Sequence, residues 1–387
     1  MTEELLNELR EQYLDKAISH RRQFHQNPEL SFLEFKTAEY IRAKLTELSI
    51  EYKELYTTGT VAHIGSGKRC IALRADIDAI PISENTGLDY SSKNYNVMHA
   101  CGHDMHTAAL LIVCEYLKKH ESELNCTVKL IFQPAEEEQP GGAIRMIDEG
   151  ALENPVPEMI FAAHIFPETE IGTISLSAGP VMASTNEIYV DVFGRGGHAA
   201  QPHLGGDAIL ASANIINYYQ SVTTKFRNPV YPSVLSIASI DGRSAVNAFP
   251  DMVRMKGVLR CYDEDLRSHL LDLIRERTPK LAELYDCTAE VNIVHGYPAV
   301  MNSTRAVDFA EHCAKNVVGR ENVLPFEPKM WAEDFAHYAK IVQGALVFVG
   351  SAPIGEESYP LHNAKLNPDE TAMLYISAFF IELCREF

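Results

Sequence analysis

The chain has 387 residues, and its 34 Lys+Arg against 53 Asp+Glu give a formal net charge of −19. At about 100–200 residues per domain, this length predicts two or three domains. Hydrophobic residues make up 46% and charged residues 22%, which excludes disorder, collagen and coiled coil as descriptions of the whole chain. The acidic excess, with no basic block, excludes nucleic acid and anionic membrane surfaces as partners, because both are bound by clusters of Lys and Arg.

The N-terminus and the cysteines bear on the compartment. The first 26 residues are charged and helical in pattern, without the basic segment and apolar run of a signal peptide. The eight cysteines are scattered, and none forms a Cys-x-x-Cys pair. No window has the roughly 18 consecutive apolar residues of a membrane helix. We therefore expect a reduced, cytoplasmic setting.

Residues 1–182 alternate between helical and strand patterns. The expected helices lie near residues 4–25, 34–48, 104–119 and 140–150. The expected strands lie at residues 50–55, 60–65, 70–75, 127–133, 159–165 and 172–177. Strands that alternate with helices of this length predict an α/β sheet covered by helices on both faces.

From about residue 183 the pattern changes. The expected strands here are 187–194, 233–242, 252–262 and 289–294, with a helix at 207–222. A second helix has an apolar face that begins at Leu266, and Pro279 is expected to break or kink it. The resulting β-α-β-β-α-β order is that of the ferredoxin-like unit. Residues 183–295 therefore predict an α+β domain inserted into a domain formed by residues 1–182 and 296–387.

A cluster of metal-type side chains lies in MHACGHDMHTA (98–108). This segment contains His99, Cys101, His103 and His106 around one glycine. Thiolate and imidazole suit zinc-like and manganese-like ions, and Cys-Gly-His puts two ligands on one tight turn. Taken singly, Cys101 could be a small core residue and His106 a hydrogen-bonded helix residue.

Three consecutive carboxylates, Glu136 to Glu138, follow the expected strand in LIFQPAEEEQPGGA (130–143). They could simply interact with the positive end of the next helix. Alternatively, one carboxylate binds a cation and its neighbour moves a proton, which is the division that a metal hydrolase requires.

Weaker candidates lie in four other segments. Asp76 and Asp78 follow an apolar run in RADIDAIP (74–81), where they could also be a turn or a helix cap. His164 in FAAHIFP and His362 in YPLHNAKLNPDE are weak when taken alone, since either could be a hydrogen-bonded structural histidine. GRGGHAAQPH (194–203) lacks the Lys-Ser/Thr of a P-loop, so its glycines are expected to turn the chain sharply and expose His198. If the fold brings the acids, histidines and cysteine together, they would form a two-ion site.

The order of these motifs, together with NPELSFLEFKTAEYI near the N-terminus, resembles a known family. It is similar to the amidohydrolase branch of the aminoacylase/carboxypeptidase G metallopeptidase superfamily, which includes hippurate hydrolase, auxin-conjugate hydrolases and N-acetyldiaminopimelate deacetylase. The similarity extends from about residue 20 to residue 385. It implies a metallopeptidase catalytic domain with a mixed sheet flanked by helices, and an inserted ferredoxin-like lid that dimerises.

The resemblance also implies roles for individual residues. Glu136 matches the general base, Asp78 an acid that supports the catalytic centre, and His198 a residue that reaches the active site of a partner subunit. Asn247 and Arg260 match positions that hold the substrate carboxylate. The positions that match metal ligands are Cys101, His103, Glu137, His164 and His362. Asp76 occupies a position where the wider superfamily has a ligand histidine.

The expected activity is hydrolysis of the amide bond of N-acyl-L-amino acids, with a small-molecule substrate and a homodimer or tetramer. One or two divalent ions are implied, Mn²⁺ or Zn²⁺ first, with Co²⁺ and Ni²⁺ also compatible. A dipeptidase or carboxypeptidase with the same type of site is an alternative. So are an amidase with Cys101 as nucleophile and a metal-dependent binding protein. Trp331 and the Glu138–Pro140 loop depart from the family pattern and bear on the shape of the acyl pocket.

Overall fold

The computed structural model describes residues 2–355 and 357–387, which form two compact units. The first unit comprises Met1–Val181, Met301–Glu327 and Glu333–Phe387, and the second comprises Met182–Val300 and Pro328–Ala332. Among the described residues we find no helix with the length and apolar character needed to span a bilayer.

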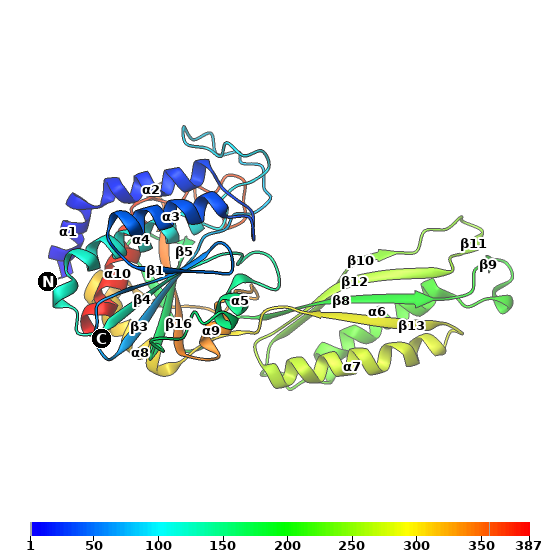
Figure 1. Cartoon of the computed structure of the whole chain (residues 1–387). Coiled ribbons are helices and arrows are strands. Elements are labelled where there is room, and N and C mark those ends of the chain that lie inside the picture. Colours follow the sequence, from blue (N-terminus) through cyan, green and yellow to red (C-terminus); the bar gives the residue numbers. More distant parts are fainter. Residues whose placement is uncertain (1, 356) are drawn as a thin grey trace. The chain divides into compact units, whose positions relative to one another are not determined.

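The first unit is built on an eight-stranded mixed sheet with the order β1-β2-β4-β3-β5-β16-β6-β15 (Figure 1). Its strands are β1 (Tyr52–Leu55), β2 (Gly59–Ile64), β3 (Cys70–Asp76), β4 (Thr127–Gln133), β5 (Met159–Glu170), β6 (Ile174–Leu176), β15 (Val323–Pro325) and β16 (Gln343–Ala352). The four central strands, β4, β3, β5 and β16, are parallel. Every residue of β3 and β4 is buried, as expected of parallel strands covered on both faces.

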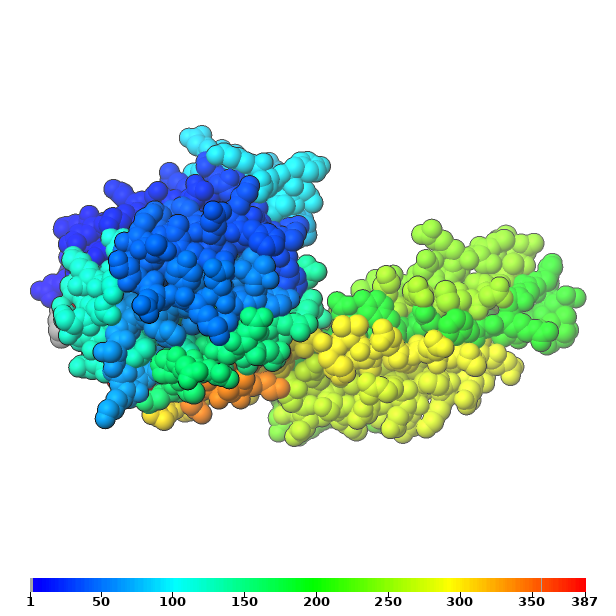
Figure 2. Space-filling model, viewed as in Figure 1, coloured from blue at the N-terminus to red at the C-terminus, as the bar shows by residue number. Residues whose placement is uncertain are grey.

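Helices pack against this sheet and share its hydrophobic core. They are α1 (Thr2–Gln12), α2 (Leu14–Gln26), α3 (Phe35–Glu47), α4 (His103–Lys119), α5 (Gly142–Asp148), α8 (Thr304–Val318), α9 (Ala336–Ala339) and α10 (Ala372–Glu386). Figure 2 shows N-terminal residues, coloured blue, covering much of the visible face of this unit. The helix expected over residues 4–25 is in fact two, because it is interrupted at Tyr13, whose buried ring packs against Tyr116.

The second unit contains a four-stranded antiparallel sheet with the order β10-β12-β8-β13. Its elements are β8 (Ser184–Phe193), α6 (Ala208–Lys225), β10 (Ser233–Asp241), β12 (Met252–Cys261), α7 (Glu264–Glu283) and β13 (Thr288–His295). Alternate residues of β8 and β12 are buried with the apolar faces of α6 and α7. The observed element order is the predicted β-α-β-β-α-β order.

The sequence predicts a break or a kink at Pro279. Helix α7 continues through Pro279, so the prediction of a break there is wrong. Proline cannot donate a hydrogen bond to the carbonyl of Arg275. Arg275 is exposed, so water can satisfy that carbonyl and the helix can continue to Glu283.

Short elements complete the two units. The remaining strands are β7 (Gly179–Met182), β9 (Gly197–His198), β11 (Ala248–Phe249) and β14 (Val300–Asn302), which form the pairs β11-β9 and β14-β7. The single-turn helices are η1 (Glu121–Glu123), η2 (Pro202–Leu204) and η3 (Arg320–Asn322).

Candidate metal centre

The parallel strands of the first unit bring the candidate residues to one region of the sheet. Asp76 ends β3, and Gln133 ends β4 directly before the segment that carries Glu136 and Glu137. Because β5 runs parallel to β3, it presents His164 toward the same edge. Ligands of α/β proteins commonly bind at this carboxyl edge.

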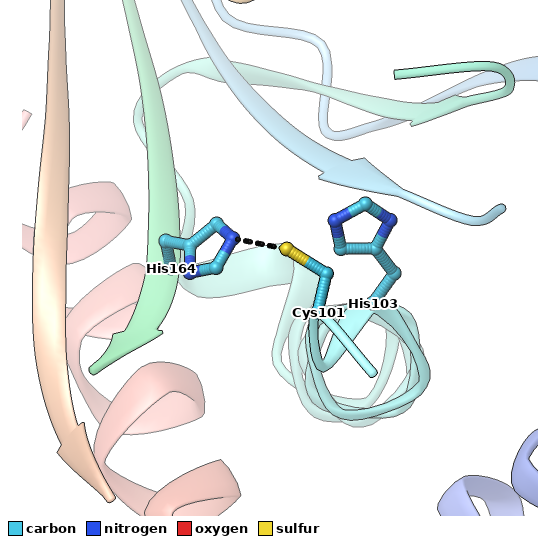
Figure 3. Close-up of side chains that lie close together, drawn as sticks. All are labelled: Cys101, His103 and His164. Carbon is cyan, nitrogen blue, oxygen red and sulfur yellow. Dashed lines mark hydrogen bonds between the residues drawn. The ribbon is translucent and has the colours of Figure 1, made fainter. Parts of the chain in front are cut away.

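The start of α4 supplies two further side chains, and a glycine makes this possible. Gly102 has φ +88°, and a Cβ built on it would lie 2.3 Å from the Cδ1 atom of Ile165. Only glycine combines a positive φ with so close an approach. The tight turn brings Cys101 against the strand that carries His164, with Sγ 3.5 Å from Nε2 (Figure 3).

The five predicted ligands lie together in the first unit. The carboxylate of Glu137 is 3.1 Å from Nε2 of His362 and 3.9 Å from Nε2 of His103. Among the described residues, five overlapping groups have their ligand atoms within 4.8 Å of one another, and three of these groups contain at least two of the predicted ligands. These three groups are Cys101/His103/His164, Cys101/Glu137/His362 and His103/Glu136/Glu137.

Two of the histidines present a bare nitrogen to this cluster. The Nδ1 atom of His164 lies 2.7 Å from the carbonyl of Ile165, and Nδ1 of His103 lies 3.0 Å from the carbonyl of Asp78. Since a carbonyl only accepts, both Nδ1 atoms must donate, which leaves a lone pair on each Nε2 when the ring is neutral. Nε2 of His103 is buried and has no hydrogen-bond partner among the described residues. Histidines held by Nδ1 in this way are typical metal ligands, so these residues fit a bound cation.

The electrostatics also favour a cation. Burial, followed by the nearby Glu137 and Glu136, raises the pKa of the Cys101 thiol well above its usual range. Burial alone would lower the pKa of His103, but Asp76 and Asp78 raise it to about 10. A divalent ion would relieve the repulsion among these acids and allow the thiolate to form.

Asp78 supports two of the predicted ligands without belonging to any of the ligand groups found among the described residues. Its Oδ1 atom is 3.1 Å from Nδ1 of His103, and its Oδ2 atom accepts from the backbone N–H of Glu137 at 2.9 Å. Burial raises its pKa, but the hydrogen bond and charge of His103, together with the hydrogen bonds from Glu137 and Ser31, outweigh burial and the net pKa is lowered. Asp78 therefore stays ionised and holds both ligand segments.

Asp76 and His106 form a buried pair that adjoins the cluster through His103, with Oδ2 of Asp76 3.8 Å from Nε2 of His103. Nδ1 of His106 is 2.7 Å from Oδ1 of Asp76, and its Nε2 atom accepts from the backbone N–H of Ile165 at 2.9 Å. Both nitrogens of His106 are therefore engaged. This arrangement matches the alternative given for His106 in the sequence analysis, a hydrogen-bonded helix residue.

The sequence alone did not point to a buried ionic network beside Glu136. Arg74 bridges to Glu333 and Asp334, each at 2.9 Å. Asp334 also accepts from the Gln133 side chain and from the backbone N–H of Ala143, both at 2.9 Å. It thereby ties together the two ends of the segment that carries Glu136. The available sequence signal was a charged Arg74 inside an otherwise apolar strand.

Replacing Arg74 with alanine should destabilise the protein by about 3–5 kcal/mol, because it leaves Glu333 and Asp334 buried without the guanidinium that both contact. Urea unfolding would measure this loss. Lys44→Ala is the control in the same unit, since its pair with Glu47 is exposed and should cost about 1 kcal/mol or less. Equal losses in the two variants would contradict the prediction.

The second unit places the three other predicted residues at two locations. His198 and Asn247 are exposed and adjacent, since the N–H of Ala199 donates to the carbonyl of Asn247 at 2.9 Å. Arg260 is half-buried near the other end of β12. At 3.3 Å per residue, the eight residue steps from Met252 to Arg260 span about 26 Å. One copy of this unit therefore keeps Arg260 far from His198 and Asn247.

Comparison with known proteins identifies the family. Residues 72–385 match peptidase family M20/M25/M40. The chain belongs to this family. It is 36% identical over 373 residues to N-acetyl-L-cysteine deacetylase of Bacillus subtilis (strain 168), covering 95% of this chain and 87% of the relative. It is 34% identical over 380 residues to thermostable carboxypeptidase 1 of Saccharolobus solfataricus, covering 96% and 95%.

Comparison with a solved structure supports the same family assignment. A Bacillus subtilis protein described as a dinuclear metal-binding peptidase of this family superposes with a TM-score of 0.83 at 31% identity, covering 97% of this chain and 98% of that one. The predicted family resemblance and α/β metallopeptidase fold are confirmed. The chain is a hydrolase of this family, and its ligand groups support divalent metal ions as cofactors.

Proposed function

We propose that this protein hydrolyses the amide bond of N-acyl-L-amino acids, with Glu136 as general base. One observation carries the proposal. Glu136 is buried, and its carboxylate lies with Glu137 and His103 in one group whose ligand atoms are within 4.8 Å of one another. Cys101, His164 and His362 belong to the overlapping groups. A base held this close to a set of metal ligands suits hydrolysis by an activated water.

Each side chain then has a defined task. A bound divalent ion would polarise the amide carbonyl and lower the pKa of a bound water toward about 7. Glu136 would take a proton from the attacking water as the water oxygen bonds to the carbonyl carbon, and would pass this proton to the amine nitrogen as the C–N bond breaks. Burial, followed by Glu333 and Glu137, raises the pKa of Glu136, which favours acceptance of that proton. Asp78 keeps His103 and Glu137 in place during the transfer.

The second unit would contribute groups that bind the substrate. The Nδ1 atom of His198 accepts from the backbone N–H of Ala200 at 3.0 Å. The neutral ring therefore carries its proton on Nε2, which can donate to the developing oxyanion. Arg260 is a half-buried guanidinium suited to a substrate carboxylate. The distance between Arg260 and the His198–Asn247 pair favours a homodimer in which each active site uses Arg260 of one chain and His198 and Asn247 of the other.

A mixing experiment tests this arrangement. His198→Ala and Glu136→Gln homodimers should each be nearly inactive. After subunit exchange, half of the dimers carry one chain of each kind, and one of their two sites is complete. Activity should therefore recover to about a quarter of the wild-type level. Native mass spectrometry of the mixture verifies that heterodimers form, and no recovery despite exchange would contradict action of His198 across the interface.

The nucleophilic alternative fits the site less well. A thiol nucleophile must be ionised, and reactive cysteines have lowered pKa values. Burial and the neighbouring carboxylates raise the pKa of Cys101. The same arrangement suits a thiolate that is stabilised by a cation.

The carboxypeptidase alternative is favoured by the similarity to thermostable carboxypeptidase 1. The substrate experiment therefore compares N-acetyl and N-benzoyl amino acids with dipeptides and N-blocked peptides, using protein reconstituted in turn with Mn²⁺, Zn²⁺, Co²⁺ and Ni²⁺. We expect the highest kcat/KM on an N-acyl amino acid. Preference for peptides would support the carboxypeptidase alternative, and no hydrolysis with any ion would overturn the proposal.

A further inference from the structure

Glu34 is a fully buried carboxylate that has no role in the proposed chemistry, although it belongs to the NPELSFLEF motif. Its Oε1 atom accepts from the backbone N–H of Ala135 at 2.8 Å and from the N–H of Phe32 at 2.9 Å. Its Oε2 atom accepts from the hydroxyl of Thr58 at 2.9 Å. Glu34 thus joins the N-terminal segment directly to the residue that precedes Glu136.

Ala135 needs such support because of its backbone conformation. Its φ is +52°, a left-handed conformation that costs a non-glycine residue about 1–2 kcal/mol. Strained residues of this kind persist where their surroundings hold them in place. The N–H of Ala135 is held by Glu34, and its carbonyl accepts from the N–H of Gly142 at 3.0 Å. These two bonds fix the orientation of the peptide that leads into Glu136.

The residue on the other side of the base is held in the same way. The N–H of Glu137 donates to Asp78, and Asp78 also accepts from the Ser31 hydroxyl at 2.7 Å. Ser31 and Glu34 belong to the same N-terminal segment. Two buried carboxylates therefore hold the backbone N–H groups immediately before and after Glu136, and both are in contact with this segment.

We propose that Glu34 is a positioning residue for the general base, and that it acts through Ala135 to aim the Glu136 carboxylate at the reacting water. This inference rests on the proposed role of Glu136. A misplacement of about 1 Å in an active site can cost about 10²-fold in rate. The contact therefore bears on kcat more than on substrate affinity.

The test compares Glu34→Ala with Glu34→Gln. Alanine removes the acceptor for Ala135, so kcat should fall by about 10–100-fold while KM stays within about two-fold. Glutamine keeps one oxygen for the two N–H groups and offers an amide that can donate to Thr58. Burial, followed by Asp78, raises the pKa of Glu34 to about 7, so a neutral group is compatible with the site. Glu34→Gln should retain near wild-type kcat.

Two readouts do not depend on turnover. Amide hydrogen exchange in a fragment spanning residues 134–143 should accelerate in Glu34→Ala and remain unchanged in Glu34→Gln. Metal content should be the same in both variants, because Asp78 still holds Glu137. If Glu34→Ala shows the same amide hydrogen exchange and the same kcat as the wild type, the inference is overturned.

Glu29→Ala is the matched control. The Glu29 carboxylate accepts from the N–H groups of Lys36 and Thr37, so its loss perturbs the same segment without removing a bond to Ala135. Kinetic constants normalised to folded protein should stay at the wild-type level in this variant. A kcat loss equal to that of Glu34→Ala would show a general folding effect and overturn the positioning role. The wild-type protein could prove inactive on all substrates while amide hydrogen exchange of residues 134–143 still accelerates only in Glu34→Ala. That result would overturn the proposed function but would support the contact between Glu34 and Ala135.

Discussion

Glu136→Gln should lower kcat by about 10²–10⁴-fold, the usual contribution of general acid–base catalysis, while KM and metal content stay close to those of the wild type. Glutamine has almost the same shape as glutamate but cannot accept the water proton. Glu136 is also surrounded by acids, with Glu333 and Glu137 among the groups that raise its pKa. Removing its charge should therefore not weaken the fold. Steady-state kinetics and elemental analysis of the same preparation would measure both quantities.

Glu138→Gln is the control for this prediction. Glu138 lies two residues further along the same segment and is exposed, so the substitution removes the same charge without changing the buried cluster. Its kcat should match that of the wild type. Full activity in Glu136→Gln, or an equal loss in both variants, would contradict the assignment of the base.

Cys101→Ala should weaken metal binding by more than the roughly 10–100-fold that is typical when only a supporting partner of a ligand is lost. The Cys101 sulfur belongs to two of the ligand groups, one with His103 and His164 and one with Glu137 and His362. Its loss would remove one ligand from each of these two groups. Dialysed protein should contain less metal than the wild type, and kcat/KM at low metal concentration should fall in parallel.

Cys114→Ala is the matched control, because Cys114 is a buried free cysteine in α4, the helix that follows Cys101, and belongs to none of the ligand groups found among the described residues. Its metal content should be unchanged. The pair of variants also separates the two chemical alternatives for Cys101. An inactive Cys101→Ala protein that keeps its full complement of metal would favour a thiol nucleophile over a metal ligand.

The tertiary structure decided which of the candidate side chains belong together. His164 and His362 were weak candidates in sequence, because a single histidine near a strand end is usually a structural residue. In the folded chain, Cys101 Sγ lies 3.5 Å from His164 Nε2, and Glu137 Oε1 lies 3.1 Å from His362 Nε2. Sequence periodicity reports which face of an element is apolar, and it contains no information on distances between segments more than sixty residues apart.

Two buried carboxylates also show what the sequence alone could not reveal. Glu34 and Asp334 look like ordinary surface acids in sequence, yet both are fully buried and hydrogen-bonded to the segment that carries Glu136. Their function depends on backbone N–H groups of Ala135 and Ala143, which no side-chain pattern reveals. Only the folded chain shows that these acids support the catalytic segment.

The sequence by itself determined the α/β alternation of the first unit, the β-α-β-β-α-β order of the second, and the residue types available for metal chemistry. These follow from local rules of periodicity, turn formation and ligand preference. The break at Tyr13, the continuation of α7 through Pro279 and the network around Arg74 depended on tertiary packing. The net charge of −19 shows the difference between a property of the sequence and a property of the fold. The size of this charge is a property of the sequence. The fold determines that four of the acids lie around buried imidazoles, namely Asp76, Asp78, Glu136 and Glu137. They meet there because the ends of parallel strands bring acids from separate segments to one edge of the sheet.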